Sequence, residues 1–439
     1  MKSGGESMKS TGRPAQGTAG LPDAIAQAIT ELDELLADSD HALQTRYPGD
    51  RPGRQPVHTA YVPADQFQPD LAAEWGRLAT AALADCVPSP ADFGAAMGLP
   101  DDIAGVVRDR VTAKLATEPV EDFRLDFEDG YKPAGDADAA EDADAVAAAG
   151  RLADAVVSGS APPFTGIRSK SLEAATRLRA IRTITIFLAE LLARGPLPAG
   201  FVLTLPKVSS ADQVQALALL CGRLEQTFGL PGGSLTFEIQ AETPQLILGP
   251  DGSATIASCV RAGGARLAGV HYGTYDYAAA LGVAGDFQRL DHPAADHARE
   301  TLQVAVAGTG VRLSDGSHNV LPAGSRSEVI AAWQQHSGLV RRALERGFYQ
   351  GWDLHPAQLA SRYAATYGFF AAGLPRACER LRNYTESART GTLEEPATAR
   401  ALAGFLLRGH DCGAISAADI SERCGLDIAV LTSLRQARR

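Results

Sequence analysis

Eight short runs rich in β-branched and aromatic residues alternate with longer stretches of helical periodicity between residues 57 and 354. In segments such as ADQVQALALLCGRLEQTF the apolar residues recur at the spacing of one helix face. Strands that alternate with helices form parallel sheets joined by right-handed crossovers. The pattern therefore predicts an α/β fold, a TIM (β/α)8 barrel. Its expected strands are VHTAYVPA, DFRLDFED, FTGIRSK, FVLTLPKV, LTFEIQAE, RLAGVHYG, GVRLSDG and FYQGWDL.

A doubly wound open sheet is the alternative architecture. Such a sheet normally carries a Gly-rich phosphate turn after its first strand, and AYVPADQF is not one. Outside the barrel, residues 1–20 are small and polar and predict a disordered N-terminus. Residues 21–56 predict an amphipathic helix and a linker. We expect the catalytic barrel in residues 57–373 and a helical C-terminal extension in 374–439.

The C-terminal extension has two interpretations. As a lid over the barrel mouth, it would offer the side chains of Tyr384, Glu386, Glu394, Glu395 and Asp411. As an outer structural layer, it would pack its apolar residues on the barrel wall, namely Phe405, Leu406, Leu407, Ile415, Leu426, Ile428 and Leu431. We favour the lid.

Charge and cysteine content exclude several classes of function. Lys and Arg number 41 against 52 Asp and Glu, and the net charge of −11 excludes the broad basic surface that nucleic acids or anionic membranes require. The six scattered cysteines form no C-x-x-C pair, which predicts buried, reduced thiols. Neither a signal-peptide core nor an apolar run of ~18 residues occurs, so we expect a cytoplasmic protein without membrane contact.

Polar residues follow the predicted strands, and the carboxyl ends of barrel strands are where catalytic groups gather. Glu242 and Asp276 follow the neighbouring fifth and sixth strands, where two carboxylates could share one Mg²⁺ (or Mn²⁺). Such a cation could stabilise an enolate. The other candidates at this mouth are Glu128, Asp129, Arg168, Lys207, Tyr272, Gly273 and His355.

Structural roles remain open for some of these residues. Arg168 or Lys207 could be an ion-pair partner of Glu128 or Asp129. His355 precedes a proline and could be a hydrogen-bonded turn residue. His271 lies within an apolar strand, so we expect a hydrogen-bonded core histidine and do not count it among the site candidates.

Seven motifs, in order from about residue 61 to 359, resemble one known family. VHTAYVPADQF is similar to its "FVPG" segment, RLDFEDGYKP to "LDLEDAV", GIRSKS to "RVN" and LTLPKVSSADQV to "LPKVESAEDV". QAETPQLI is similar to "IETPRGV", HYGTYDYAAALG to "FGPGDYAASLG" and GFYQGWDLHPAQL to "GFxGKWCIHPSQI". The family is the citrate lyase β subunit, malyl-CoA lyase and hydroxy-keto-acid aldolase (HpcH/HpaI) group of the phosphoenolpyruvate/pyruvate-domain TIM barrels.

The resemblance implies a Mg²⁺-dependent carbon–carbon lyase that acts through the enolate of a small oxo or hydroxy acid or its CoA thioester. It implies that Glu242 and Asp276 bind the metal and that Arg168 holds the substrate. Glu128 and Asp129 would orient Arg168 or water, and Lys207 would anchor them. Tyr272, Gly273 and His355 would complete the substrate site, and homo-oligomers are expected.

Two departures from the family leave alternatives open. Asp129 stands where the metal-dependent aldolases have the histidine of "D-G-E-H", so the acid or base is unassigned. No segment resembling "LDGKMID" follows His355, which places CoA binding in question. The alternative functions are phosphoryl transfer on phosphoenolpyruvate, for which the chain shows no nucleotide motif, and non-catalytic binding of a keto acid.

Overall fold

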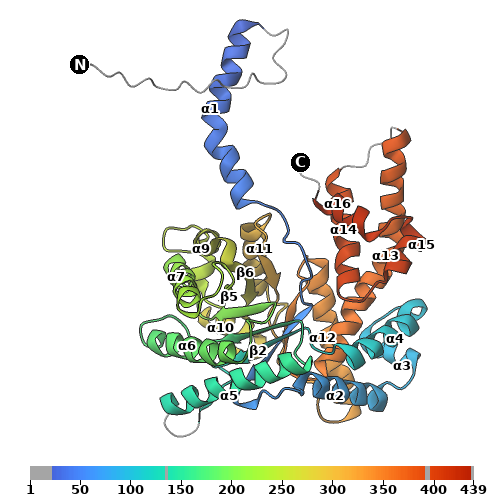
Figure 1. The fold of residues 1–439 in the computed structure, drawn as a ribbon. Coiled ribbons are helices and arrows are strands. Elements are labelled where there is room, and N and C mark those ends of the chain that lie inside the picture. The colour runs from blue at the N-terminus through green and yellow to red at the C-terminus, as the bar shows by residue number, and fades with distance from the viewer. Residues whose placement is uncertain (1–21, 134–136, 391–395, 437–439) are drawn as a thin grey trace. The chain divides into compact units, whose positions relative to one another are not determined.

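The protein forms an eight-stranded parallel sheet rolled into a nearly closed barrel and surrounded by helices (Figure 1). The computed structural model describes residues 22–133, 137–390 and 396–436. All eight predicted strands are present, and the predicted TIM barrel is confirmed. The strands are β1 (His58–Pro63), β2 (Asp122–Asp126), β3 (Phe164–Arg168), β4 (Phe201–Leu205), β5 (Thr236–Ala241), β6 (Leu267–Tyr272), β7 (Arg312–Ser314) and β8 (Gly351–Asp353).

The strands lie in the order β7-β6-β5-β4-β3-β2-β1-β8. The first and last strands pair in parallel at the closing seam, where His58 stands opposite Gly351. A bridge between Ser317 and Trp352 brings the segment after β7 to β8 and nearly completes the ring. Because every pairing is parallel, the carboxyl ends of all eight strands gather at one mouth.

Helices cover the outside of the barrel, and local sequence sets several of their ends. Ser325 caps the start of α12, and the Glu328 carboxylate accepts a hydrogen bond from the Ser325 backbone N–H. The helices between the strands are α2 (Leu71–Cys86), α3 (Pro90–Met97), α4 (Asp101–Thr117), α5 (Ala137–Ser158), α6 (Arg177–Arg194), α7 (Ala211–Phe228), α8 (Pro244–Ile247), α9 (Thr255–Gly263), α10 (Thr274–Ala280), α11 (Pro293–Val306) and α12 (Arg326–Glu345). Short 3-10 turns are η1 (Ala64–Gln66), η2 (Gly264–Arg266) and η3 (Gly285–Phe287).

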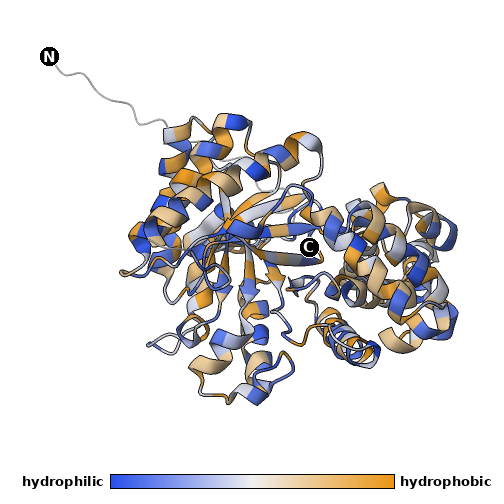
Figure 2. Cartoon of the chain, turned by 90° about the horizontal axis from the view of Figure 1, so that it is seen from below, coloured by the Kyte–Doolittle hydropathy of each residue, from blue (hydrophilic) through white to orange (hydrophobic). Residues whose placement is uncertain are grey.

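The hydrophobic core lies between the sheet and its helices, whereas the barrel interior is polar. Phe123 of β2 packs edge-on against Trp75 of α2, with ring centroids 5.7 Å apart. The next residue along β2, Arg124, instead points inward, since its Nε donates to Glu238 of β5 across the barrel. Hydrophilic and hydrophobic residues accordingly alternate along the strands (Figure 2).

The closing seam contains a buried cluster centred on Asp353. Its Oδ1 accepts a hydrogen bond from Arg362 Nη2 (2.8 Å), and its Oδ2 lies 3.0 Å from His58 Nδ1. Burial opposes the ionisation of Asp353, but the positive charge of Arg362 outweighs it and holds the pKa of this carboxyl below its usual range. His336 of α12 lies 3.4 Å from the same carboxylate, and burial lowers the pKa of this imidazole to about 3. The Asp353 carboxylate therefore connects the seam to α12 and to the helix that contains Arg362.

The chain divides into two compact units, Met1–Pro48 and Gly49–Arg439. In the first unit, α1 (Asp23–Arg46) occupies the segment in which an amphipathic helix was expected. The second unit contains the barrel and the C-terminal helices. The domain boundaries expected near residues 20, 56 and 373 stay predictions. No helix in the described ranges is both long and apolar enough to cross a membrane.

The C-terminal helices lead away from the mouth, since the first of them begins just after the carboxyl end of β8 and the later ones pack beside the amino ends of the strands. They are α13 (Gln358–Thr390), α14 (Pro396–Asp411), α15 (Ala417–Cys424) and α16 (Ile428–Gln436). Within α13, Tyr363 Oη donates to the carbonyl of Pro119, which precedes β2, and Tyr367 Oη donates to the carbonyl of Cys412. Arg408 of α14 and Arg435 of α16 line one hollow with Arg312, the first residue of β7, at the amino ends of the strands. The prediction that the extension closes its own chain's mouth is therefore wrong.

The alternative, an outer structural layer, is confirmed. The Phe405 ring contacts Phe370 with centroids 5.0 Å apart, and the other predicted apolar residues are buried or packed on the core, namely Leu406, Leu407, Ile415, Leu426, Ile428 and Leu431. Of the proposed lid residues, Tyr384 packs against the core and Asp411 ends α14. The Glu386 side chain, Glu394 and Glu395 lie outside the described residues.

Glu225, near the end of α7, makes the folding stability of the protein depend on pH. Its buried carboxylate pairs with Arg266 (Oε1–Nη1 2.5 Å) and accepts the backbone N–H of Leu235 (2.8 Å). The Arg266 hydrogen bonds hold the pKa of this carboxyl at about 2, although burial opposes the shift. Since an unfolded glutamate titrates near ~4.3, the pair contributes stability above that pH and loses it as the pH falls toward 2.

Glu225→Gln should therefore lower the free energy of unfolding by about 3 kcal/mol at pH 7, because a pKa difference of roughly two units corresponds to that order of energy. The difference from the unsubstituted protein should shrink as the pH falls from about 5 to 2. Urea unfolding of both proteins at several pH values measures it. A difference that stays constant over this range would contradict the assignment.

Candidate active site

Polar side chains from five consecutive strands meet at the carboxyl end of the barrel. Strand register brings Asp126, the last residue of β2, opposite Arg168, the last residue of β3. The remaining side chains follow directly after β2, β4, β5 and β6. They are Glu128 and Asp129 (loop after β2), Lys207 (after β4), Glu242 (after β5) and Asp276 (first turn of α10). The structure therefore brings most of the sequence-predicted site residues together.

Arg168 is held by Asp126, the last residue of β2. Its Nε and Nη2 each donate to a carboxylate oxygen of Asp126 at 2.6 Å, a bidentate pair. Asp126 also accepts the backbone N–H groups of Glu128 and Gly130, both at 2.9 Å. A Cβ on Gly130 would lie 2.8 Å from Asp126 Oδ2, so this close approach requires glycine. Asp126 thus joins Arg168 to the loop after β2.

The outer edge of Arg168 faces the site. Its Nη1 lies 3.3 Å from Glu128 Oε2 and 3.4 Å from Gln240 Oε1. The guanidinium also lies over the Tyr61 ring, with Cζ 4.8 Å from the centroid. Burial opposes the charged form, but Asp126 outweighs it and raises the pKa of Arg168. Arg168 therefore stays a cation, and Asp126 leaves its Nη1 edge to the other side chains of the site.

Lys207 bridges the carboxylates on both sides of the mouth. Its Nζ lies 2.5 Å from Glu128 Oε1, 3.0 Å from Asp129 Oδ1 and 3.6 Å from Asp276 Oδ2. Among the described residues, Lys207 is the one non-glycine with positive φ, at 53°. A lysine in this conformation is uncommon, and strained backbone often occurs at functional sites. This backbone conformation places the Lys207 ammonium group among the three carboxylates with which it pairs.

Glu242 is an almost fully buried carboxylate of this cluster, with 3% of the residue exposed. Its Oε1 accepts the Lys207 backbone N–H at 2.6 Å. A Cβ on Gly273 would lie 2.5 Å from Glu242 Cβ and 2.7 Å from its Oε2, so Gly273 leaves the space that Glu242 occupies. Burial raises the pKa of Glu242 to about 7, against the opposing charge of Arg168 and Lys207.

The cluster has an excess of negative groups and so fits a cation. Two cations, Arg168 and Lys207, face five carboxyl groups, those of Asp126, Glu128, Asp129, Glu242 and Asp276. In the described residues, no three carboxylate, imidazole or thiolate groups already surround one metal position. Glu242 and Asp276 could hold a divalent ion as a pair, with water or substrate oxygens as its other ligands.

Two predicted substrate contacts lie apart from this cluster. Tyr272 is fully buried, and its ring packs edge-on against Tyr277 with centroids 5.7 Å apart. His355 Nδ1 accepts the Ala357 backbone N–H at 3.2 Å, which is the predicted turn interaction. In the described part of the chain, no hydrogen bond or ion pair joins His355 to Lys207 or Glu242. Substrate contact by Tyr272, Gly273 or His355 stays a prediction.

Below the mouth lies a buried polar network that sequence reasoning missed. Arg124 binds Asp122 (Nη2–Oδ2 2.8 Å) and Glu238 (Nε–Oε1 3.0 Å). His271 Nε2 lies 2.9 Å from Glu238 Oε2, and Trp352 Nε1 donates to His271 Nδ1 at 3.0 Å. The prediction that His271 is a hydrogen-bonded core residue is therefore confirmed. Burial opposes the ionisation of Glu238, but Arg124 and His271 outweigh it and lower its pKa to about 2.

A signal for this network is present in the sequence. Charged or polar residues recur at every second position along the second and fifth strands, as Asp122, Arg124 and Asp126 and as Glu238, Gln240 and Glu242. Period two places them on one face of each strand. The network supports the candidate site from below, because Gln240 follows Glu238 by two residues on the same face of β5, and its Oε1 lies 3.4 Å from Arg168 Nη1.

Two solved structures with similar folds are distant from this chain in sequence. Malate synthase of Haloferax volcanii, in a magnesium and glyoxylate complex, is 14% identical, and the match covers 88% of this chain and 100% of that one with a TM-score of 0.46. The citrate lyase beta subunit of Mycobacterium tuberculosis, complexed with oxaloacetate and magnesium, is 19% identical over 71% of this chain and 96% of that one, with a TM-score of 0.39. At this distance, neither match carries a conclusion about chemistry to this chain.

No curated protein sequence matches the chain. A family model matches residues 36–439, which include the whole barrel, the candidate site and the C-terminal helices. Its description is a domain of unknown function, DUF6986. The chain belongs to the DUF6986 family.

Proposed function

We propose that the protein is a Mg²⁺-dependent (or Mn²⁺-dependent) carbon–carbon lyase or aldolase that acts through the enolate of a small oxo or hydroxy acid or its CoA thioester. The observation that supports it most is the buried carboxylate of Glu242 beside Asp276, in a cluster with more carboxyl groups than cations. A divalent cation bound to this pair would supply a Lewis acid that stabilises negative charge on an enolate oxygen.

The chain's own residues would position the substrate. The Nη1 edge of Arg168, which Asp126 leaves available, would meet the carboxylate of an oxo acid. Lys207 would hold Glu128 and Asp129 in place and compensate part of their charge. Asp126 is a positioning residue, because it acts through Arg168 and the loop after β2.

Turnover assays with defined acids test this proposal. The purified protein should convert a member of a panel that includes oxaloacetate, 4-hydroxy-2-oxo acids and malyl-CoA, and should do so only with Mg²⁺ or Mn²⁺ present. Proton NMR of the mixtures detects the cleavage products without a coupled enzyme. Saturable binding of pyruvate without conversion of any panel member would instead support a keto-acid-binding protein. Neither binding nor conversion would refute both.

Arg168→Lys should weaken the binding of oxalate or pyruvate in the presence of Mg²⁺ by roughly ten-fold to a few hundred-fold. Lysine keeps the charge but loses the planar fork, and charge-assisted hydrogen bonds of that kind are worth about 1.5–3 kcal/mol. Calorimetric titration with oxalate measures the change. Arg182→Lys is the matched control, since Arg182 lies on the outer helix α6 with 60% of its side chain exposed. Unchanged oxalate affinity in Arg168→Lys would show that Arg168 serves only the fold.

A further inference from the structure

A second hollow lies at the opposite end of the barrel from the candidate active site. Its wall includes Val57, Arg312 and Gly347, which lie at or just before the amino ends of β1, β7 and β8. The other wall comes from α14 and α16. The hollow has a volume of about 210 Å³, which is below the ~300–1,000 Å³ typical of sites for drug-sized ligands. It therefore suits a small occupant.

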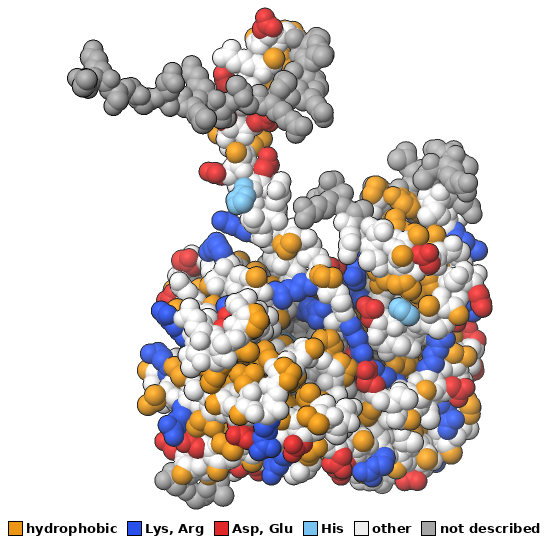
Figure 3. Space-filling model, in the orientation of Figure 1, with side chains coloured by type: hydrophobic (Ala, Val, Ile, Leu, Met, Phe, Trp, Pro, Cys, Tyr) orange, Lys and Arg blue, Asp and Glu red, His pale blue; other side chains and the backbone are white. Residues whose placement is uncertain are grey.

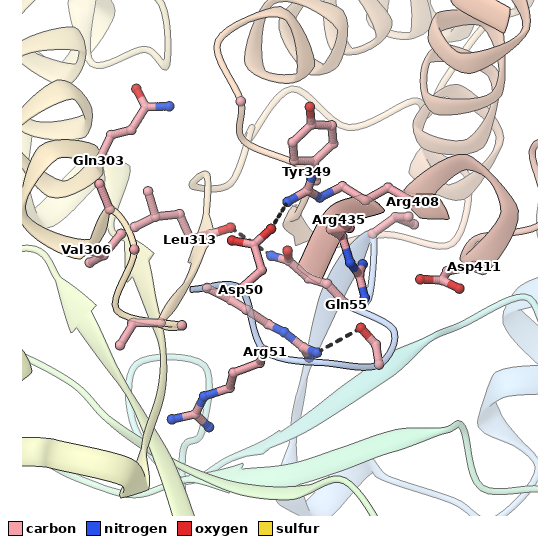
Figure 4. A pocket seen from close by; sticks show the side chains of 18 of the residues that line it. Asp50, Arg51, Gln55, Gln303, Val306, Leu313, Tyr349, Arg408, Asp411 and Arg435 are labelled. Carbon is pink, nitrogen blue, oxygen red and sulfur yellow. Dashed lines mark hydrogen bonds and ion pairs between the residues drawn. The ribbon is translucent and has the colours of Figure 1, made fainter. Parts of the chain in front are cut away.

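Four arginines line this hollow, which we call the arginine pocket: Arg51, Arg312, Arg408 and Arg435. Figure 4 shows Arg51, Arg408 and Arg435 around one space, with Asp50 joined to Arg408. Lys and Arg side chains also gather on this face between the barrel and the C-terminal helices (Figure 3). Asp50 and Asp411 are the acidic residues among those that line the pocket, so positive groups exceed negative ones.

Most of the arginine charge in the pocket is not neutralised. Arg51 Nη2 donates to the carbonyls of Ala265 (2.9 Å) and Leu267 (2.7 Å), and Arg312 Nη2 donates to that of Gly53 (3.3 Å). Carbonyl groups satisfy hydrogen bonds but carry no net charge. Among the described residues, Arg435 makes no hydrogen bond or ion pair, and Arg408 alone has a carboxylate partner.

The arginines also repel one another. Burial is the main cause that lowers the pKa of Arg312, and the positive charges of Arg51, Arg408 and Arg435 lower it further, although the negative charge of Asp411 opposes them. Burial likewise lowers the pKa of Arg51. Like charges held together in a half-buried space raise the free energy of the empty state. A dianion placed among them would remove this repulsion and gain charge-assisted hydrogen bonds.

From this arrangement the geometry points to a phosphate-binding site in the arginine pocket, for free phosphate or the phosphate group of a small ester. Arginine matches the tetrahedral oxygens of phosphate with its planar fork. Gly310, with φ of 78°, brings the loop before β7 against Arg51, where an added Cβ would lie 3.1 Å from Arg51 Cγ. The bound group would join the barrel to α14 and α16. This site is independent of the proposed enzymatic function.

Calorimetric titration of the full chain with inorganic phosphate, at constant ionic strength, tests the site. We expect saturable binding and a rise in the thermal unfolding temperature that sodium chloride at equal ionic strength does not produce. A parallel titration with glycerol 3-phosphate distinguishes the two sources, because tighter binding of the ester would assign the site to phosphate esters. Tighter binding of phosphate would assign it to the free ion.

Arg435→Gln should weaken phosphate binding at least ten-fold without changing the unfolding temperature in phosphate-free buffer, since Arg435 has no partner to lose among the described residues. Arg423→Gln is the matched control, because it removes the same charge from an exposed position on α15 outside the pocket. Equal affinity in Arg435→Gln and the control would place phosphate elsewhere and overturn the proposal. So would the absence of saturable binding of both phosphate and glycerol 3-phosphate.

Discussion

Glu242→Gln is expected to abolish Mg²⁺ binding and turnover while the barrel stays folded. The amide keeps the size of the side chain, and its oxygen can still accept the Lys207 backbone N–H. Because burial already raises the pKa of Glu242 to about 7, a neutral group at this position costs the fold little. The affinity for Mg²⁺ should fall by more than about a hundred-fold, since even outer partners of a metal site are worth about 10–100-fold. Asp276→Asn should have the same direction of effect.

Calorimetry with MgCl₂ on the two variants measures this loss, and thermal unfolding checks the fold. Asp109→Asn is the matched control, because Asp109 is an exposed carboxylate on the outer helix α4. Undiminished Mg²⁺ affinity in both Glu242→Gln and Asp276→Asn would refute the metal assignment. Mg²⁺ binding that is lost in the control as well would show that the ion binds the acidic surface without a specific site.

Arg124→Met is expected to lower the free energy of unfolding by about 3–5 kcal/mol, the range found when one partner of a buried ion pair is removed. Arg124 is 1% exposed and contacts both Asp122 and Glu238. Without it, two carboxylates remain inside the barrel with the cation between them gone. The cost comes from this uncompensated charge rather than from lost packing, because methionine fills a similar volume.

A second substitution separates charge from packing. Arg124→Met combined with Glu238→Gln removes one of the two carboxylates that lose Arg124 as a partner, so the double variant should be more stable than Arg124→Met alone. Urea unfolding at pH 7 measures all three proteins. If Arg124→Met loses less than about 1 kcal/mol, water solvates the remaining Asp122 and Glu238 carboxylates inside the barrel. A double variant less stable than the single would mean that packing dominates.

The barrel could be predicted from sequence because each strand is a short, β-rich run bounded by polar or turn residues, as in FVLTLPKV. The location of the C-terminal helices could not. Helical periodicity identifies the apolar face that contains Phe405 and Leu406, but the same face would pack equally well on a mouth or on the amino ends of the strands. The choice depends on contacts with residues far away in sequence, such as the hydrogen bond from Tyr363 to Pro119.

The positions of the site carboxylates followed from the fold, since the ends of parallel strands converge wherever the barrel closes. The ion-pair partners of these groups could not be predicted in the same way. Arg168 could bind Asp126, Glu128 or Asp129 equally well by sequence, and register decides, because Arg168 stands directly opposite Asp126. Which edge of the guanidinium faces a ligand is therefore a tertiary property. The polar interior was predictable in principle from the period-two pattern of Asp122, Arg124 and Asp126.

The pairing of β1 with β8 determines when the barrel can close during translation. His58 and Asp353 meet at the seam from opposite ends of the barrel sequence, so the ring cannot close until the ribosome has released β8 and Arg362 behind it. Until then β1 and β7 present open edges whose unpaired backbone groups can bind other chains. The interval before β8 emerges is thus the one in which a nascent molecule most needs protection from aggregation.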